Sequence, residues 1–362
     1  MNIYDSKIWR KDVEKAMTIL PELEKLSGKS VMITGCTGLI CSAVIDVIIR
    51  WNETHPAKIH ILAAGRSEQK VVERFEPYAH KDWFVYLPYD AASENTLPIG
   101  CDYIIHGAGN ASPDKIVSEP VETMLSNFMG MKHLLDLAKE QNTKRLLFIS
   151  SSEVYGIRQH DRPSKTDDYG RIDLLNPRSS YSIGKCAAET LCAAYYDEYR
   201  VESVIVRPGH VYGPTAMESD QRVSSAWAHA VARGNDIVMK SDGSQIRSYC
   251  YCLDSATAIL KVLLQGKPVH AYNISNPDSI ITIREMAEIL TKKAGVKLKM
   301  EPPTEAEKKG FNPMRDSSLD STELIDLGWR GLFDAENGLA HTVDILKQIL
   351  KGTSKNRFEK RK

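Results

Sequence analysis

Between residues 30 and 210, short apolar runs alternate with longer amphipathic stretches, and this alternation restricts the possible folds more than any other feature. Short runs that are apolar throughout are typical of strands buried on both faces of a sheet. Strands separated by helices form parallel sheets covered by helices on both sides, so the pattern predicts an α/β fold. The expected strands are Ser30–Thr34, Ile59–Ala63, Trp83–Leu87, Tyr103–His106, Arg145–Ser150 and Ser203–Arg207, and the expected helices are Leu39–Trp51, Glu119–Gln141 and Tyr181–Tyr199.

After about residue 210 the alternation weakens, which predicts a smaller C-terminal lobe rather than a second complete sheet. The segment before the first strand contains a helical stretch, Trp9–Leu26, and the basic, polar end of the chain is expected to be frayed. The expected organisation is a helical extension (1–28), a sheet domain (29–210), a lobe (211–350) and a tail (351–362). In the lobe, helices are expected at Ala226–Arg233, Asp254–Gln265 and Thr282–Ala294, and strands at Ile237–Lys240 and Arg247–Tyr251.

The composition excludes several classes of partner. Lys+Arg and Asp+Glu are equal at 47 each, so no bulk charge attracts nucleic acid or an anionic membrane. No apolar run approaches the ~20 residues that span a bilayer, and the first residues lack the apolar core of a signal peptide. Seven scattered cysteines favour reduced thiols in the cytoplasm. Cys250 and Cys252 have no second pair at ligand spacing, so we expect a structural role for them and no metal site.

The first expected strand runs directly into the turn Gly35-Cys-Thr-Gly38-Leu-Ile-Cys41 and then into a helix. Glycines in such a turn let the backbone approach a pyrophosphate at the helix N-terminus, where free N–H groups attract anions. The turn therefore predicts a Rossmann-type, doubly wound sheet that binds NAD or NADP. Cys41 stands where the usual pattern has a third glycine, and we expect altered packing with retained binding. The turn residues expected to contact the cofactor are Gly35, Thr37, Gly38, Leu39 and Ile40.

The choice between NAD and NADP is open. The second strand usually ends in a carboxylate that binds the adenosine ribose, but here it is followed by Arg66. Arg66 facing a 2′-phosphate would favour NADP, whereas Arg66 stacked on the adenine or pointing to solvent leaves NAD. Asp90, after the third strand, is an expected partner of the adenine amine.

Tyr181-Ser-Ile-Gly-Lys185 places a phenol and an amine four residues apart, on one face of a helix. We expect Lys185 to lower the pKa of Tyr181 and to hold the nicotinamide ribose, so both residues also contact the cofactor. The phenolate would then remove a hydroxyl proton while hydride leaves to the cofactor. Ser151, thirty residues upstream at the end of a strand, is expected to hydrogen-bond the reacting oxygen.

With these three features in order, the chain resembles the extended short-chain dehydrogenase/reductase family from about residue 29 to 350. It is most similar to the nucleotide-sugar branch of NAD-dependent epimerases and dehydratases. Further segments that carry the resemblance are His106-Gly-Ala-Gly109, Asn127-Phe-Met-Gly130, Arg207-Pro-Gly-His-Val-Tyr-Gly-Pro214, Gly243-Ser-Gln-Ile-Arg247, Asn273-Ile-Ser-Asn-Pro277 and Leu327-Gly-Trp329.

The resemblance implies a nucleotide-sugar substrate, a UDP-sugar above all, held by the C-terminal lobe. It also implies a homodimer formed through the helices at 119–141 and 181–199. Arg247 matches an arginine that pairs with the diphosphate, and His210 stands where relatives often have asparagine. The remaining residues carried over are Ala108, Gly109 and Pro208 for the cofactor and Ser152 and Arg178 for the substrate.

Members of this branch begin by oxidising the sugar C4 hydroxyl to a ketone. Ser152-Glu153-Val-Tyr-Gly resembles the corresponding segment of UDP-glucuronate decarboxylases, which makes a decarboxylase the leading interpretation and Glu153 its expected acid/base. A 4-epimerase or a 4,6-dehydratase stays open, because some of these enzymes also carry the glutamate. An NADPH-dependent reductase and a non-catalytic nucleotide sensor stay open as well.

Overall fold

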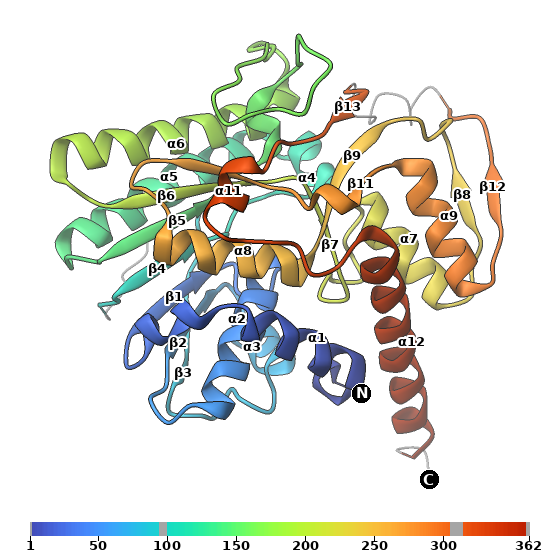
Figure 1. The fold of residues 1–362 in the computed structure, drawn as a ribbon, viewed down its shortest axis with the longest axis horizontal. Coiled ribbons are helices and arrows are strands. Elements are labelled where there is room, and N and C mark those ends of the chain that lie inside the picture. Colours follow the sequence, from blue (N-terminus) through green and yellow to red (C-terminus); the bar gives the residue numbers. More distant parts are fainter. Residues whose placement is uncertain (1, 94–99, 305–313, 360–362) are drawn as a thin grey trace.

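The computed structural model describes residues 2–93, 100–304 and 314–359, and within them seven parallel strands form the central sheet (Figure 1). From β1 the chain adds β2 and β3 on one side, and it then crosses back to add β4, β5 and β6 on the other. This topology confirms the predicted doubly wound, Rossmann-type α/β fold. The strands, in spatial order, are β10 (Ala271–Ile274), β6 (Ser203–Pro208), β5 (Arg145–Ile149), β4 (Tyr103–His106), β1 (Ser30–Thr34), β2 (His60–Gly65) and β3 (Phe84–Pro88).

Two apolar clusters, one on each face, hold the helices to the sheet. Alternate strand side chains point to opposite faces, so in β1 Val31 and Ile33 join one cluster and Met32 joins the other. The first face is covered by α2 (Leu39–Thr54) and α8 (Cys252–Gln265), and the second by α5 (Pro120–Glu140) and α6 (Ser180–Tyr199) (Figure 1). Both faces are thus buried, as the continuous apolar strands predict. The short helices α3 (Glu68–Arg74) and α4 (Pro113–Ser118) lie in the connections.

The chain after residue 210 builds a lobe beside the sheet and also returns to it, through α8 and β10. A small mixed sheet centres on β9, and α7, α9 and α12 pack on one another at the right of Figure 1. The lobe elements are β7 (His210–Tyr212), α7 (Val223–Ala232), β8 (Ile237–Met239), β9 (Ile246–Tyr251), β11 (Ile280–Thr282), α9 (Ile283–Ala294), β12 (Leu298–Met300), β13 (Asp316–Ser317), α11 (Thr322–Asp326) and α12 (Ala335–Glu359).

Two expectations for the chain ends need correction. The helical stretch Trp9–Leu26 is divided into α1 (Lys7–Thr18) and a 3-10 turn (Pro21–Leu26), because Pro21 disfavours helical backbone before it. The expected frayed tail is wrong for residues 351–359, since α12 continues to Glu359. Val343 and Leu346 anchor that helix in the core, and no proline follows them to end it.

The N-terminal extension ties the two ends of the fold together. Trp9 is fully buried against α2 and α8, within the first apolar cluster. The carboxylate of Asp12 accepts a hydrogen bond from the Tyr251 hydroxyl at 3.2 Å and lies 2.9 Å from Nδ1 of His341 on α12. Lys15 also donates to the carbonyl oxygen of Leu332 at 2.9 Å. The extension is therefore an integral layer that links the sheet to the C-terminal lobe.

Candidate active site

The turn after β1 has the backbone geometry expected of a phosphate cradle. Gly35 has a φ of +70°, and a Cβ there would lie 3.0 Å from the backbone of Gly107 and Ala108. Gly38 caps α2 without a side-chain hydrogen bond, so backbone N–H groups at the start of that helix face the turn. A side chain at position 35 would therefore press on the backbone that follows β4 and distort the turn. The residues present therefore fit a dinucleotide cofactor.

Cys41 replaces the third glycine of the usual pattern, and a glycine directly after the neighbouring strand β4 makes room for it. A Cβ on Gly107 would lie 2.4 Å from the Cys41 sulfur and 3.1 Å from Ile149 Cδ1. The missing side chain at Gly107 thus lets α2 approach the sheet although position 41 carries a thiol. The close packing of helix and strand that the third glycine normally allows is kept, because here Gly107, rather than residue 41, is the position without a side chain.

The other expected cofactor residues follow the carboxyl ends of neighbouring parallel strands, at one edge of the sheet. Arg66 follows β2 and is exposed, while Asp90 follows β3 and accepts a hydrogen bond from the Ala92 N–H at 3.1 Å. Ala108 follows β4 and its N–H donates to the Thr34 hydroxyl at 3.2 Å. Gly109 comes next along the chain, Pro208 ends β6, and Thr37, Leu39 and Ile40 belong to the turn itself and the start of α2.

Tyr181, Lys185 and Ser151 meet at the same edge. Tyr181 and Lys185 are both buried on α6, one turn apart, with the Lys185 amine 5.8 Å from the centre of the Tyr181 ring. The amine donates to the carbonyl oxygen of Ile149, the last residue of β5, at 2.8 Å. The Ser151 side chain lies close enough to Tyr181 to influence its pKa, and its hydroxyl accepts from the Glu153 N–H at 3.2 Å. The spacing seen in the sequence therefore becomes one cluster.

Burial sets the proton affinities in this cluster. It raises the pKa of Tyr181 to about 12, with the nearby Glu153 carboxylate adding to the rise, while the Ser151 side chain opposes it. Burial also lowers the pKa of Lys185 to about 8, because the charged amine is removed from water. A phenol in this setting gives up its proton only with help from neighbouring cations and donors.

Glu153 lies on the 3-10 turn Ser152–Tyr155, where it forms an ion pair with the Arg178 guanidinium. The two guanidinium nitrogens reach the two carboxylate oxygens at 2.7 and 2.9 Å. The Ser182 hydroxyl donates to one of the same oxygens at 3.2 Å, and Ser152 beside them is buried. In the structure the guanidinium of Arg178 therefore points toward the Glu153 carboxylate.

His210 and Arg247 face the same region from the lobe. Arg247 on β9 is 3% exposed, and no carboxylate in the described ranges forms an ion pair with it. Burial lowers the pKa of Arg247, which indicates a cation whose charge is poorly compensated. His210 on β7 has a buried Nδ1 without a protein partner in the described part of the chain. Burial, followed by the charge of Arg247, lowers the pKa of His210 to about 4, so its ring is neutral. These features suit an anionic, hydrogen-bonding ligand.

Residues 31–275 match the model of the NAD dependent epimerase/dehydratase family. The chain belongs to that family. NAD is accordingly its cofactor, and when bound it supplies a hydride acceptor and donor. Of the residues described above, the Gly35–Ile40 turn would hold its pyrophosphate, and Tyr181 and Lys185 would hold its nicotinamide part.

Two relatives within the family share most of their length with this chain. UDP-glucuronic acid decarboxylase 1 of Danio rerio is 27% identical over 337 residues, which cover 93% of this chain and 77% of that protein. UDP-glucuronic acid decarboxylase 6 of Arabidopsis thaliana is 30% identical over 276 residues, or 76% of this chain and 77% of the relative.

A solved structure confirms the fold of the family for this chain. The UDP-glucose 4-epimerase of Thermotoga maritima, solved with UDP-glucose, superposes with a TM-score of 0.74 at 21% identity. The match covers 89% of this chain and 99% of the epimerase. Among the residues that the structure describes, no helix is both long enough and apolar enough to cross a bilayer.

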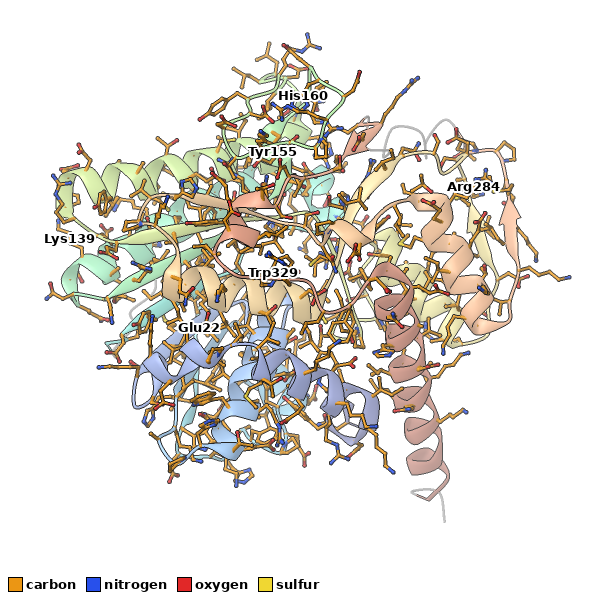
Figure 2. All side chains as sticks on the ribbon, in the orientation of Figure 1. Glu22, Lys139, Tyr155, His160, Arg284 and Trp329 are labelled. Atoms are coloured by element: carbon orange, nitrogen blue, oxygen red, sulfur yellow. The ribbon has the colours of Figure 1, made fainter. Side chains whose placement is uncertain are left out.

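The sequence analysis did not predict a buried ion pair between Glu189 and Arg207, which lies next to the site. Glu189 and Arg207 form a fork at 2.6 and 3.0 Å, and the Ser150 hydroxyl donates to the same carboxylate at 2.5 Å. Arg207 also donates to the Tyr155 hydroxyl (labelled in Figure 2), which in turn donates to Asn273. One available signal is that Glu189 lies four residues after Lys185, on the same helix face as the family's two catalytic-motif residues.

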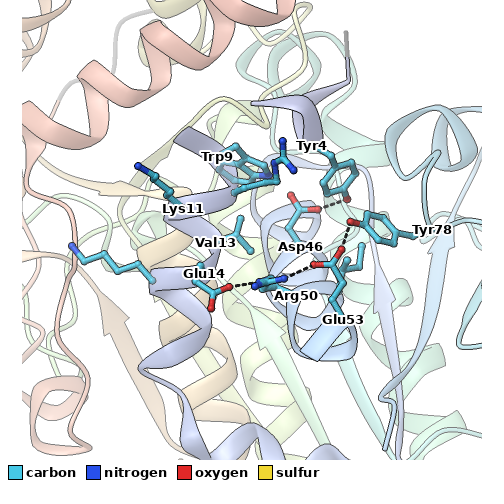
Figure 3. Close-up of a pocket in the computed structure, with 12 residues that line it drawn as sticks. Tyr4, Trp9, Lys11, Val13, Glu14, Asp46, Arg50, Glu53 and Tyr78 are labelled. Atoms are coloured by element: carbon cyan, nitrogen blue, oxygen red, sulfur yellow. Dashed lines mark hydrogen bonds and ion pairs between the residues drawn. The ribbon is translucent and has the colours of Figure 1, made fainter. Parts of the chain in front are cut away.

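A cavity of about 520 Å³ lies elsewhere, between α1 and α2. Figure 3 shows that its three acids and Arg50 have partners: Tyr4 donates to Asp46, Tyr78 donates to Glu53, and Arg50 bridges Glu53 and Glu14. Since the acids and the central arginine satisfy one another, this cavity is part of the packing of the N-terminal extension. The family's sequence motifs lie at the carboxyl edge of the sheet instead.

Proposed function

We propose that the chain decarboxylates a nucleotide-activated uronic acid, UDP-glucuronate, through a 4-keto intermediate. The observation that carries this proposal is Glu153, an ionisable group fixed beside Tyr181 and Ser151 in addition to the residues that oxidation requires. A 4-epimerase needs no such group, whereas proton transfer at C5 does. The similarity to two UDP-glucuronic acid decarboxylases supports the same choice.

The side chains suggest a division of labour. Ser151 would hold the C4 oxygen, and Tyr181, as a phenolate, would accept the proton of the C4 hydroxyl while C4 is oxidised by loss of hydride. The C6 carboxylate is then a β-keto acid. Its C5–C6 bond breaks, carbon dioxide leaves, and the electron pair forms a C4–C5 enolate. Glu153 would take a proton from solvent and pass it to C5.

The lobe (211–350) would hold the nucleotide. Arg247 is a buried cation without a carboxylate partner in the described residues, and a diphosphate would supply the missing negative charge. The neutral ring of His210 would offer its unpartnered Nδ1 to the same ligand. Arg66 is exposed, and binding of NAD rather than NADP agrees with an arginine that points to solvent.

Mass spectrometry of UDP-glucuronate incubated with the pure protein and no added cofactor tests the proposal. We expect a UDP-pentose, formed by loss of one carbon dioxide when the hydride returns to C4, or a UDP-4-keto-pentose, which has lost carbon dioxide and, in addition, a hydride to NAD and a proton. An isomer of unchanged mass would replace the proposal by an epimerase, and loss of water from a neutral nucleotide hexose would replace it by a dehydratase. Turnover only with added NADPH would indicate a reductase, and binding without any turnover would indicate a sensor.

We also propose a cytoplasmic homodimer. All seven cysteines are free thiols, which supports a reducing compartment.

The first turns of α5, which packs along α6, expose apolar side chains: Val121 is 62% and Leu125 50% exposed. Light scattering at micromolar concentration should give twice the chain mass of 40.5 kDa. Leu125→Glu should halve that mass, whereas Val72→Glu on α3 should not change it. A monomeric wild type contradicts the dimer.

A further inference from the structure

The contact between Arg178 and Glu153 joins two segments that carry different parts of the site. Arg178 lies on the 3-10 turn Pro177–Ser179, three residues before Tyr181, and the Asn176 side chain fixes that turn by accepting the Arg178 N–H at 3.1 Å. Glu153 lies two residues after Ser151. The guanidinium fork therefore fastens the Ser151 segment to the start of the helix that carries Tyr181.

The fork occupies the Glu153 carboxylate on both oxygens. Two guanidinium nitrogens at 2.7 and 2.9 Å and the Ser182 hydroxyl at 3.2 Å leave the carboxylate one fixed orientation. A bidentate pair of this kind is stronger and more directional than a contact between two flexible charges. The end-on fork commits one N–H of each terminal nitrogen of Arg178 to Glu153, so the remaining N–H groups can reach a substrate carboxylate only from the orientation that Glu153 imposes on the guanidinium.

The charges around Tyr181 show why that pairing matters. Burial and the Glu153 carboxylate raise the pKa of Tyr181, whereas Ser151, Arg222 and Arg178 lower it. Lys185, on the next turn of the same helix, lies 5.8 Å from the ring centre. An unpaired carboxylate at this place would make the phenol harder to ionise, and the positive charge of the Arg178 guanidinium acts in the opposite direction.

We propose that Arg178 is a positioning residue that orients Glu153 and balances its charge beside Tyr181, and that it does not bind the substrate. This inference rests on the proposed function only for the role of Tyr181 as proton acceptor. It replaces the substrate contact expected from the sequence. For a decarboxylation the arrangement has a chemical consequence. A substrate carboxylate gripped by an arginine is stabilised as an anion, while one left without that grip gives up carbon dioxide more readily.

The experiment follows the ionisation of Tyr181 directly, without substrate. Protein containing 3-fluorotyrosine, whose phenol ionises at lower pH than tyrosine, is titrated by ¹⁹F NMR. The resonance absent from Tyr181→Phe identifies Tyr181. We expect Arg178→Gln to raise the apparent pKa of this residue by about one unit and Glu153→Gln to lower it by about one unit. Arg178→Lys, which keeps the charge and loses the fork, should fall between Arg178→Gln and the wild type.

Binding of UDP-glucuronate, measured by calorimetry at neutral pH, supplies the second readout. Arg178→Gln should bind within about threefold of the wild type, whereas Arg247→Gln should bind at least about tenfold more weakly, as expected for loss of a charge-assisted phosphate contact. The proposal is overturned if Arg178→Gln weakens binding as much as Arg247→Gln, or if the two substitutions in the fork shift Tyr181 in the same direction or not at all. Failure of the decarboxylase proposal would appear separately, in the products of the wild type.

Discussion

The Tyr181→Phe variant is expected to turn over its nucleotide sugar about 10²–10⁴-fold more slowly than the wild type, because the group that accepts the hydroxyl proton is gone. The substitution removes one oxygen atom from a buried ring that lies close to Ser151. Ser151 keeps its contact with the Glu153 N–H at 3.2 Å, so the local fold should persist. Steady-state turnover and substrate affinity, measured on the same preparation, separate the loss of proton transfer from a loss of binding.

Tyr169→Phe is the matched control, since Tyr169 is 88% exposed and the same atom is lost there. We expect this variant to equal the wild type in rate and affinity. Retention of most of the activity by Tyr181→Phe would mean that another group accepts the proton. Loss of substrate and cofactor binding together with turnover would instead mean that the phenol mainly supports the structure of the site.

The second large effect is expected on stability. Glu189→Leu should lower the free energy of unfolding by about 3–5 kcal/mol, because it leaves the Arg207 guanidinium buried without its carboxylate. The two side chains are only 10% and 12% exposed, and they form a fork at 2.6 and 3.0 Å. The substitution also removes the acceptor of the Ser150 hydroxyl. Equilibrium unfolding in urea, followed by circular dichroism, measures the change.

Two further variants test whether the loss of stability comes from leaving one charge buried without its partner. Glu189→Leu combined with Arg207→Met removes both charges, and it should lose less stability than Glu189→Leu alone. Glu119→Ala breaks the exposed pair with Lys115, whose side chains are 42% and 45% exposed, and should cost less than about 1 kcal/mol. A loss of similar size in Glu189→Leu and Glu119→Ala would show that burial of the Glu189–Arg207 pair is energetically unimportant.

The parts of this site that the sequence predicts are local in the chain. Gly35 and Gly38 occupy one strand–turn–helix segment, and Tyr181 and Lys185 lie four residues apart on one helix, so spacing alone reports their geometry. Six of the seven strands of the central sheet were predictable for a similar reason, because each of them carries its own apolar run. Cys41 was expected to alter packing, and the structure adds the physical detail that Gly107 leaves room for its thiol.

The parts that could not be predicted depend on contacts between distant segments. Glu189 meets Arg207 and Glu153 meets Arg178 only after the sheet has brought their segments together. Strand β10 contains the polar Asn273 and so lacks a continuous apolar run, and it is defined by its pairing with β6. The length of α12 was missed because polar residues at a chain end resemble a frayed segment, although buried side chains earlier in the helix anchor it.

The hydrogen-bonding contact between Asp12 and His341 can form only late in the synthesis of the chain. These residues are separated by 329 positions, so at about 5–20 residues per second the first helix waits on the order of tens of seconds for its partner to be translated. Throughout that interval α1 lacks its contacts with α12, although α2 and α8, which cover Trp9, are translated earlier. A chain that ends before residue 341 therefore lacks the partner of Asp12 and leaves the side of α1 that faces α12 without its covering helix.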